Sequence, residues 1–219
     1  MSLIAPSILN SDFLLLGDTV QMLNESETDW IHLDVMDGSF VPNISFGIPI
    51  VEAVKKTAKK PLDVHLMIVN PEKYIEGFRQ AGADIINIHY EACQQKNLKS
   101  ILRTIRDTGA RPALAIKPDT PVSAVFDYAE YIDMVLVMSV FPGFGGQQFM
   151  EESYERIARL RSFFNDNNMD TLIQVDGGVS PGNIARLKSA GADVMVVGSV
   201  IFKSASPSNT ISELKSLVR

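Results

Sequence analysis

Two histidines and two aspartates have a spacing that would suit a metal site built on β-strands. His32 and Asp34 stand two residues apart in Ile31–Val35, so the alternation of a strand directs both side chains to the same side. His65 and Asp176 each follow a separate apolar run. Two imidazoles and two carboxylates that converge would bind a divalent cation such as Zn²⁺, Fe²⁺, Mn²⁺ or Co²⁺. The alternative is a structural hydrogen-bond network that holds a buried histidine.

Three glycine-containing segments are candidates for a phosphate site. The segment Ser139–Gln147 is dense in glycine, and the pairs Gly177–Gly178 and Gly198–Ser199 follow the last two apolar runs. Glycine lets backbone N–H groups approach a ligand closely, and a helix that begins after such a loop favours an anion. No Lys or Arg adjoins these glycines, so we expect backbone N–H groups to hold the phosphate.

Three methionines also stand where apolar runs end, at Met36, Met67 and Met138. On composition alone they would pack in the core. The alternative is that they surround a charged intermediate and exclude water from it.

Three further polar residues have other expected roles. Lys117 would be a Schiff-base lysine in an aldolase, but its loop neighbours favour a solvated side chain, whereas such a lysine is activated by desolvation. Asp37 precedes Gly38, which is typical of a turn. We expect His89 to be structural or to support the ligands from behind.

Eight short apolar segments alternate with helical patterns, and we expect them to be parallel strands. They are Leu3–Leu9, Trp30–Val35, Leu62–Met67, Ile85–His89, Arg111–Ile116, Met134–Met138, Leu172–Val175 and Val194–Val197. Their spacing favours one α/β domain over residues 1–219, a closed (β/α)8 TIM barrel, with an open doubly wound sheet as the alternative. Active groups should then lie at the carboxyl ends of strands with apolar interiors.

Composition excludes several classes of protein. The 219 residues carry a formal net charge of −6, which argues against nucleic-acid binding. The single cysteine, Cys93, excludes an internal disulfide. No apolar run has membrane-spanning length, and no signal pattern begins the chain. We expect a cytoplasmic protein.

Five motifs resemble the ribulose-phosphate 3-epimerase family and occur in its order. They are Ala5–Leu9, Ile31–Asn43, Asp63–Met67, Val137–Phe149 and Val175–Val179. The resemblance runs from about Ala5 to Phe202. It implies a barrel of the ribulose-phosphate-binding type and interconversion of D-ribulose 5-phosphate with D-xylulose 5-phosphate in the pentose phosphate pathway.

The resemblance also implies the site residues. The metal ligands would be His32, Asp34, His65 and Asp176, with one divalent ion per subunit. The residues that touch the substrate or its phosphate would be Ser7, His65, Gly143, Phe144, Gly145, Gly146, Asp176, Gly177, Gly178, Gly198 and Ser199. Members of the family are often dimers or hexamers, so a homo-oligomer is expected.

Inversion at C3 needs one group to remove a proton and another to deliver a proton on the opposite face. We expect Asp34 to be the base and Asp176 the acid, with the metal stabilising a cis-enediolate. Phe141 and Lys117 depart from the commoner family pattern, in loop detail and not in the ligands. The alternatives are a 3-epimerase of a hexulose phosphate such as D-allulose 6-phosphate, a Schiff-base aldolase that uses Lys117, and a non-catalytic sugar-phosphate binder.

Overall fold

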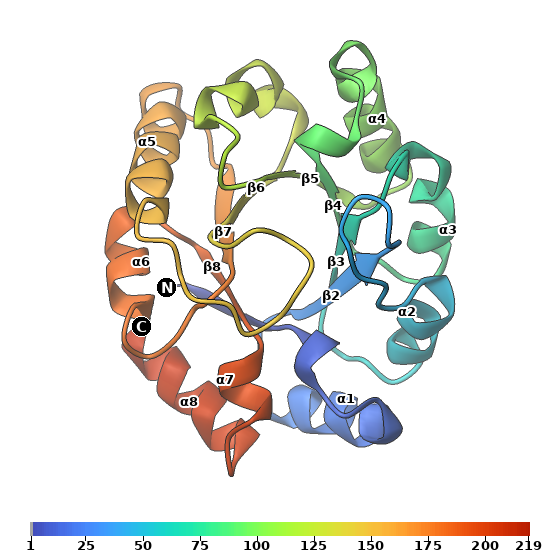
Figure 1. Ribbon diagram of the computed structural model, residues 1–219, viewed down its shortest axis with the longest axis vertical. Helices are drawn as coiled ribbons and strands as arrows, with labels where there is room; N and C mark the ends of the chain where they lie inside the picture. The colour runs from blue at the N-terminus through green and yellow to red at the C-terminus, as the bar shows by residue number, and fades with distance from the viewer. Residues whose placement is uncertain (1) are drawn as a thin grey trace.

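The computed structural model describes residues 2–219 and alternates parallel strands with helices around a central barrel (Figure 1). The strands are β1 (Leu3–Pro6), β2 (Ile31–Met36), β3 (Leu62–Met67), β4 (Ile85–His89), β5 (Arg111–Ile116), β6 (Met134–Met138), β7 (Leu172–Asp176) and β8 (Val194–Val197). The helices are α1 (Leu16–Glu25), α2 (Ile48–Lys55), α3 (Ile75–Gln80), α4 (Gln95–Asp107), α5 (Ser153–Asp166), α6 (Ile184–Ala190), α7 (Ser199–Phe202) and α8 (Pro207–Leu217). Five 3-10 helices cover Ile8–Asn10, Phe13–Leu15, Pro71–Lys73, Tyr90–Ala92 and Val122–Tyr131.

The strands form a nearly closed barrel. Their order is β1-β8-β7-β6-β5-β4-β3-β2, and each paired neighbour is parallel. The last gap, between β1 and β2, is spanned by one parallel bridge between Ser7 and His32. The predicted (β/α)8 class is therefore confirmed. The open sheet is excluded because β1 pairs along its length with β8 and the Ser7–His32 bridge joins the end of β1 to β2.

Strand boundaries follow the sequence pattern except at the ends of three strands. The first strand was predicted to reach Leu9 but ends at Pro6, because the chain turns into the 3-10 helix Ile8–Asn10 and Asn10 N–H donates to the Ser7 carbonyl at 3.4 Å. β2 is shifted by one residue and runs to Met36. β7 extends to Asp176, which is thereby held by the sheet rather than by a loop.

The main core lies between the strands and the surrounding helices. Leu33, Val64 and Leu114 are fully buried on the helix-facing side of their strands. α4 presents one apolar stripe to them, made of Leu98, Ile101, Leu102 and Ile105. Each large aliphatic side chain buried in this way stabilises the fold by roughly 1.5–3 kcal/mol. Among residues 2–219, no helix is both long and apolar enough to cross a bilayer.

The interior of the barrel corrects one prediction, that the strand interiors are apolar. An apolar layer near the amino ends of the strands includes Trp30 and Met134. Beyond it, toward the carboxyl ends, Asp63, Asn87 and Gln174 are fully buried. Their side chains meet inside the barrel: Gln174 Nε2 of β7 donates to Asp63 Oδ2 of β3, a strand that is not its neighbour in the sheet, at 2.5 Å. Hydrogen bonds offset the cost of burying such polar groups, although Asn87 Oδ1 has no partner among the described residues.

Candidate metal and substrate site

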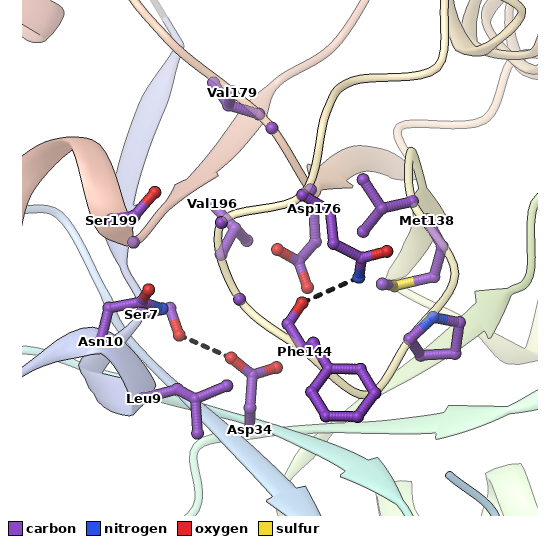
Figure 2. Close-up of a pocket in the computed structure, with 18 of the residues that line it drawn as sticks. Ser7, Leu9, Asn10, Asp34, Met138, Phe144, Asp176, Val179, Val196 and Ser199 are labelled. Carbon is purple, nitrogen blue, oxygen red and sulfur yellow. Dashed lines mark hydrogen bonds between the residues drawn. The ribbon is translucent and has the colours of Figure 1, made fainter. Parts of the chain in front are cut away.

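A cavity of about 180 Å³ opens at the carboxyl ends of the strands. Asp34 of β2 and Asp176 of β7 both reach it, and the β6–α5 loop crosses its mouth with Phe144 over it (Figures 1 and 2). The cavity is lined by Ser7, Leu9, Asn10, Asp34, Met36, Met67, Met138, Val140, residues 142–147, residues 176–180, Val196, Gly198, Ser199 and Val200. The predicted glycine segments and all three predicted methionines therefore border one space.

Four side chains converge beneath this cavity, as the sequence predicted. One ligand atom from each of His32, Asp34, His65 and Asp176 lies within 4.8 Å of the other three. Oδ1 of Asp34 is 3.2 Å from His32 Nε2 and 3.1 Å from His65 Nδ1. Oδ2 of Asp176 is 4.0 Å and 3.8 Å from the same two nitrogens.

This donor set fits a divalent metal. Two imidazole nitrogens and two carboxylate oxygens match the preferences of Zn²⁺ and its neighbours. With bonds of about 2.1 Å, ligand atoms around a tetrahedral ion are about 3.4 Å apart. The four distances between a carboxylate oxygen and an imidazole nitrogen, 3.1–4.0 Å, bracket that value. The cluster can hold an ion with small movements of the two carboxylates.

The ring of His32 is fixed from behind by the polar layer. Asp63 Oδ2 is 2.7 Å from His32 Nδ1. Asp63 also accepts hydrogen bonds from Asn87 Nδ2 at 2.7 Å and from Gln174 Nε2. A carboxylate held in this way accepts the Nδ1 proton of His32 and leaves Nε2 directed at the cluster, which is the usual support behind a metal-binding histidine.

The two aspartates of the cluster have opposite pKa shifts. For Asp34, burial alone would raise the pKa, but the charge of His32 and hydrogen bonds from His32 and His65 outweigh burial and hold the pKa far below its usual value. For Asp176, burial and the charge of Asp34 raise the pKa to about 6. The pKa of His32 is raised well above its usual value: burial opposes that shift, and Asp34 and Asp63 cause it. Below about pH 6, one carboxylate and one carboxylic acid can thus coexist.

Ser7 is positioned by the turn that ends β1. Its Oγ donates to Asp34 Oδ2 at 2.5 Å, from the side of the cavity (Figure 2). Ser7 therefore touches both the cavity and a cluster carboxylate, whereas His65 is fully buried and does not line the cavity.

The glycine loops require glycine where the backbone packs most tightly. Gly178 has φ +64°, and a Cβ there would lie 2.6 Å from the Phe149 backbone nitrogen. Gly198 would place a Cβ 2.6 Å from Nδ2 of Asn10. The backbone of Gly178 and Gly198 borders this end of the cavity directly because these residues carry no side chain.

Two of the secondary expectations are settled by hydrogen bonds. Asp37 has the predicted turn role: its Oδ1 accepts from the N–H groups of Ser39 and Phe40, each at 2.8 Å. His89 stands behind the cluster, with Nε2 2.8 Å from His65 Nε2. Lys117 does not line the cavity; its Nζ lies 4.0 Å from the centre of the Phe40 ring. Phe141 is half exposed, with 51% of its surface accessible.

Several residues of the site were not predicted. Asp63 stands two residues before His65 on the same strand, so the alternation that revealed His32 and Asp34 could have found it. Glu91 stands two residues after His89 but lies in the 3-10 helix Tyr90–Ala92, where strand alternation does not apply. Asn10 borders the glycine loops but no sequence pattern indicates it.

Comparisons with known proteins show the family and the fold of this chain. A family model described as the ribulose-phosphate 3 epimerase family matches residues 3–202. A ribulose-phosphate 3-epimerase of Synechocystis is 44% identical over 99% of this chain and 94% of its own length, and one of Aquifex aeolicus is 43% identical over 100% and 97%. A solved 3-hexulose-6-phosphate synthase covers both chains fully with a TM-score of 0.73 at 17% identity, which shows a shared fold alone. The chain belongs to the ribulose-phosphate 3 epimerase family.

Proposed function

We propose that this protein is an isomerase that interconverts D-ribulose 5-phosphate and D-xylulose 5-phosphate by inverting C3. The observation that carries the proposal is the pairing of Asp34 and Asp176 with two imidazoles at the floor of one cavity. The family membership and the names of the curated relatives support the same reaction.

The two carboxyl groups would handle the proton. Asp34, whose pKa is low, is ionised and removes the C3 proton of ribulose 5-phosphate; Asp176, whose pKa is raised, delivers a proton on the opposite face. In the reverse direction the roles exchange. Ser7 holds Asp34 Oδ2 by its hydroxyl and fixes the direction of that carboxylate.

The ligands of the metal would be His32, Asp34, His65 and Asp176. A bound divalent ion supplies positive charge for the oxygens on C2 and C3 as the enediolate develops. The buried methionines Met36, Met67 and Met138 border the same space and would keep water from the reacting carbons.

The phosphate would lie against the glycine loops. Gly145, Gly146, Gly178 and Gly198 line one side of the cavity together with Ser199. Their N–H groups can donate to phosphate oxygens without a Lys or Arg, and this binding would fix the sugar over the two carboxyl groups. Lys117 lies outside the cavity, so the contacts do not favour a Schiff-base reaction.

The decisive test is an NMR assay in D₂O with ribulose 5-phosphate and metal-loaded protein. We expect xylulose 5-phosphate that carries deuterium at C3. Epimer formation without exchange would contradict a reaction that passes through two protein carboxyls. A parallel assay with D-allulose 6-phosphate distinguishes the hexulose alternative, because we expect kcat/KM to be higher for the pentulose.

A further inference from the structure

A second imidazole and a glutamate stand in line behind His65. His65 Nε2 is 2.8 Å from His89 Nε2, and His89 Nδ1 is 3.0 Å from Glu91 Oε2. Both imidazoles are fully buried. The line therefore runs from the 3-10 helix Tyr90–Ala92 through the end of β4 to the cluster.

Glu91 is itself held in one orientation. Its Oε1 accepts the N–H of Lys117 at 2.8 Å and the hydroxyl of Thr120. The other oxygen, Oε2, is thereby directed at His89. A carboxylate accepts hydrogen bonds and donates none, so the nitrogen that faces it must carry a proton.

The position of that proton determines the rest of the line. A neutral His89 that carries its proton on Nδ1 presents a bare Nε2 to His65. A hydrogen bond between the two Nε2 atoms then requires the proton of His65 on Nε2. With a metal bound, Nδ1 of His65, the atom 3.1 Å from Asp34 Oδ1, would then present its electron pair to the ion in place of the proton that the carboxylate otherwise faces.

We infer that Glu91 and His89 are positioning residues that set the tautomer of His65 so that its Nδ1 can bind the metal. The inference rests on the metal site of the proposed function. Asp63 acts on His32 by the opposite ring nitrogen, so the two ligand histidines present different atoms to the same ion. Partners of this kind typically change metal affinity by 10- to 100-fold.

Glu91→Gln is the most informative variant. Glutamine has the shape of glutamate, but an NH₂ donor replaces one of the two accepting oxygens. The amide oxygen would stay with the two donors, Lys117 N–H and the Thr120 hydroxyl, so the amide N–H would face His89 Nδ1. His89 would then carry its proton on Nε2, where it opposes the Nε2–H of His65. Glu72→Gln is the matched control. It makes the same change of charge at an exposed residue of the β3–α3 connection.

Two measurements test the inference, and neither uses activity. Zinc affinity of the metal-free protein is measured by calorimetry, and the protonated ring nitrogens are identified by ¹⁵N NMR of the zinc-bound protein. The chain has 3 histidines, all in this site, so the imidazole spectrum contains no others. We expect His89 to be protonated at Nδ1 and bare at Nε2, and Glu91→Gln to weaken zinc binding about 10- to 100-fold, with Glu72→Gln unchanged.

The outcomes separate this inference from the proposed function. A wild-type protein that binds no zinc overturns the metal site and this inference with it. If the wild type binds zinc tightly and Glu91→Gln binds it equally tightly, the inference is overturned and the metal site of the proposed function stands. A zinc-bound wild type with the His89 proton on Nε2 also overturns it, and that measurement stands even when the variant does not fold.

Discussion

At the scale of single residues, the environment shifts the pKa values of the two cluster aspartates in opposite directions. Asp34 Oδ2 accepts the Ser7 hydroxyl, and Asp34 Oδ1 lies 3.2 and 3.1 Å from the nearest nitrogens of His32 and His65, whereas Asp176 has neither imidazole nearer than 3.8 Å. In the proposed reaction the same kind of side chain would therefore act as a base at one position and as an acid at the other. This division follows the general rule that acid and base are separated by the pKa shifts of neighbouring groups.

Asp34→Asn and Asp176→Asn each remove one proton-transfer group. We expect kcat to fall by about 10²- to 10⁴-fold in each variant, while circular dichroism shows an intact fold. Asp133→Asn is the control, because Asp133 precedes β6 at the opposite end of the barrel and pairs with Arg106. Near-normal turnover in either cluster variant would remove the two-carboxyl scheme.

Cys93 is buried, with 7% of its surface exposed. Burial, together with the charges of Glu72 and Glu91, raises the pKa of its thiol to about 12. At pH 8 only about one thiol in 10⁴ would be ionised, and the thiolate is the reactive form. We expect iodoacetamide to leave the native protein unmodified and to label it fully in guanidinium chloride, as mass spectrometry would show. Rapid labelling of the native state would contradict this burial.

At the scale of elements, the carboxyl ends of β2, β3 and β7 and the loops after β6, β7 and β8 build the site, while the helices supply the core. The β6–α5 loop crosses the end of the barrel (Figure 1), and its residues 142–147 line the cavity. Gly146 in this loop has φ +74°, and a Cβ added there would have no atom nearer than 3.9 Å. A side chain at this position would strain the backbone without a clash.

Gly146→Ala tests whether this loop binds phosphate. We expect KM to rise roughly tenfold, because a shifted N–H loses a hydrogen bond to a charged group, and the free energy of unfolding to fall by about 1 kcal/mol. Gly109→Ala is a matched control: Gly109 has φ +83°, a nearest atom at 3.8 Å, and a place between α4 and β5 at the other end of the barrel. An equal rise of KM in the control would show that backbone strain, and not phosphate contact, is responsible.

At the scale of the whole molecule, hydrogen bonds join the last helix to the segment around the first strand. Lys215 of α8 donates to the Ser2 carbonyl at 3.1 Å and to Asp29, whose Oδ2 also accepts the Ile4 N–H at 2.8 Å. The last helix is thereby tied to the first strand. We propose that residues 1–219 form one domain that unfolds in one cooperative transition; assembly into a homo-oligomer and a cytoplasmic location stay predictions.

Lys215→Met tests how much this link contributes to the free energy of unfolding. Only 9% of the lysine side chain is exposed, and loss of the cation leaves Asp29 poorly paired, so we expect the free energy of unfolding to fall by about 2 kcal/mol. Lys56→Met is the control, because the Lys56–Glu52 pair is 71% and 60% exposed and should contribute less than about 0.5 kcal/mol. Urea denaturation measures the free energy of unfolding of both variants. An equal decrease in the two would contradict a larger contribution from the Lys215–Asp29 pair.

The sequence by itself determined the barrel and the members of the cluster. The strands were predictable because strands covered on both faces are short apolar runs, and His32 with Asp34 because a strand places alternate side chains on one side. Only the tertiary structure decided what stands behind those ligands. Gln174 and Asp63 lie 111 residues apart in the chain, and the direction of a histidine ring depends on the atoms that contact it. Local periodicity does not contain such contacts, because they form only when distant strands meet inside the barrel.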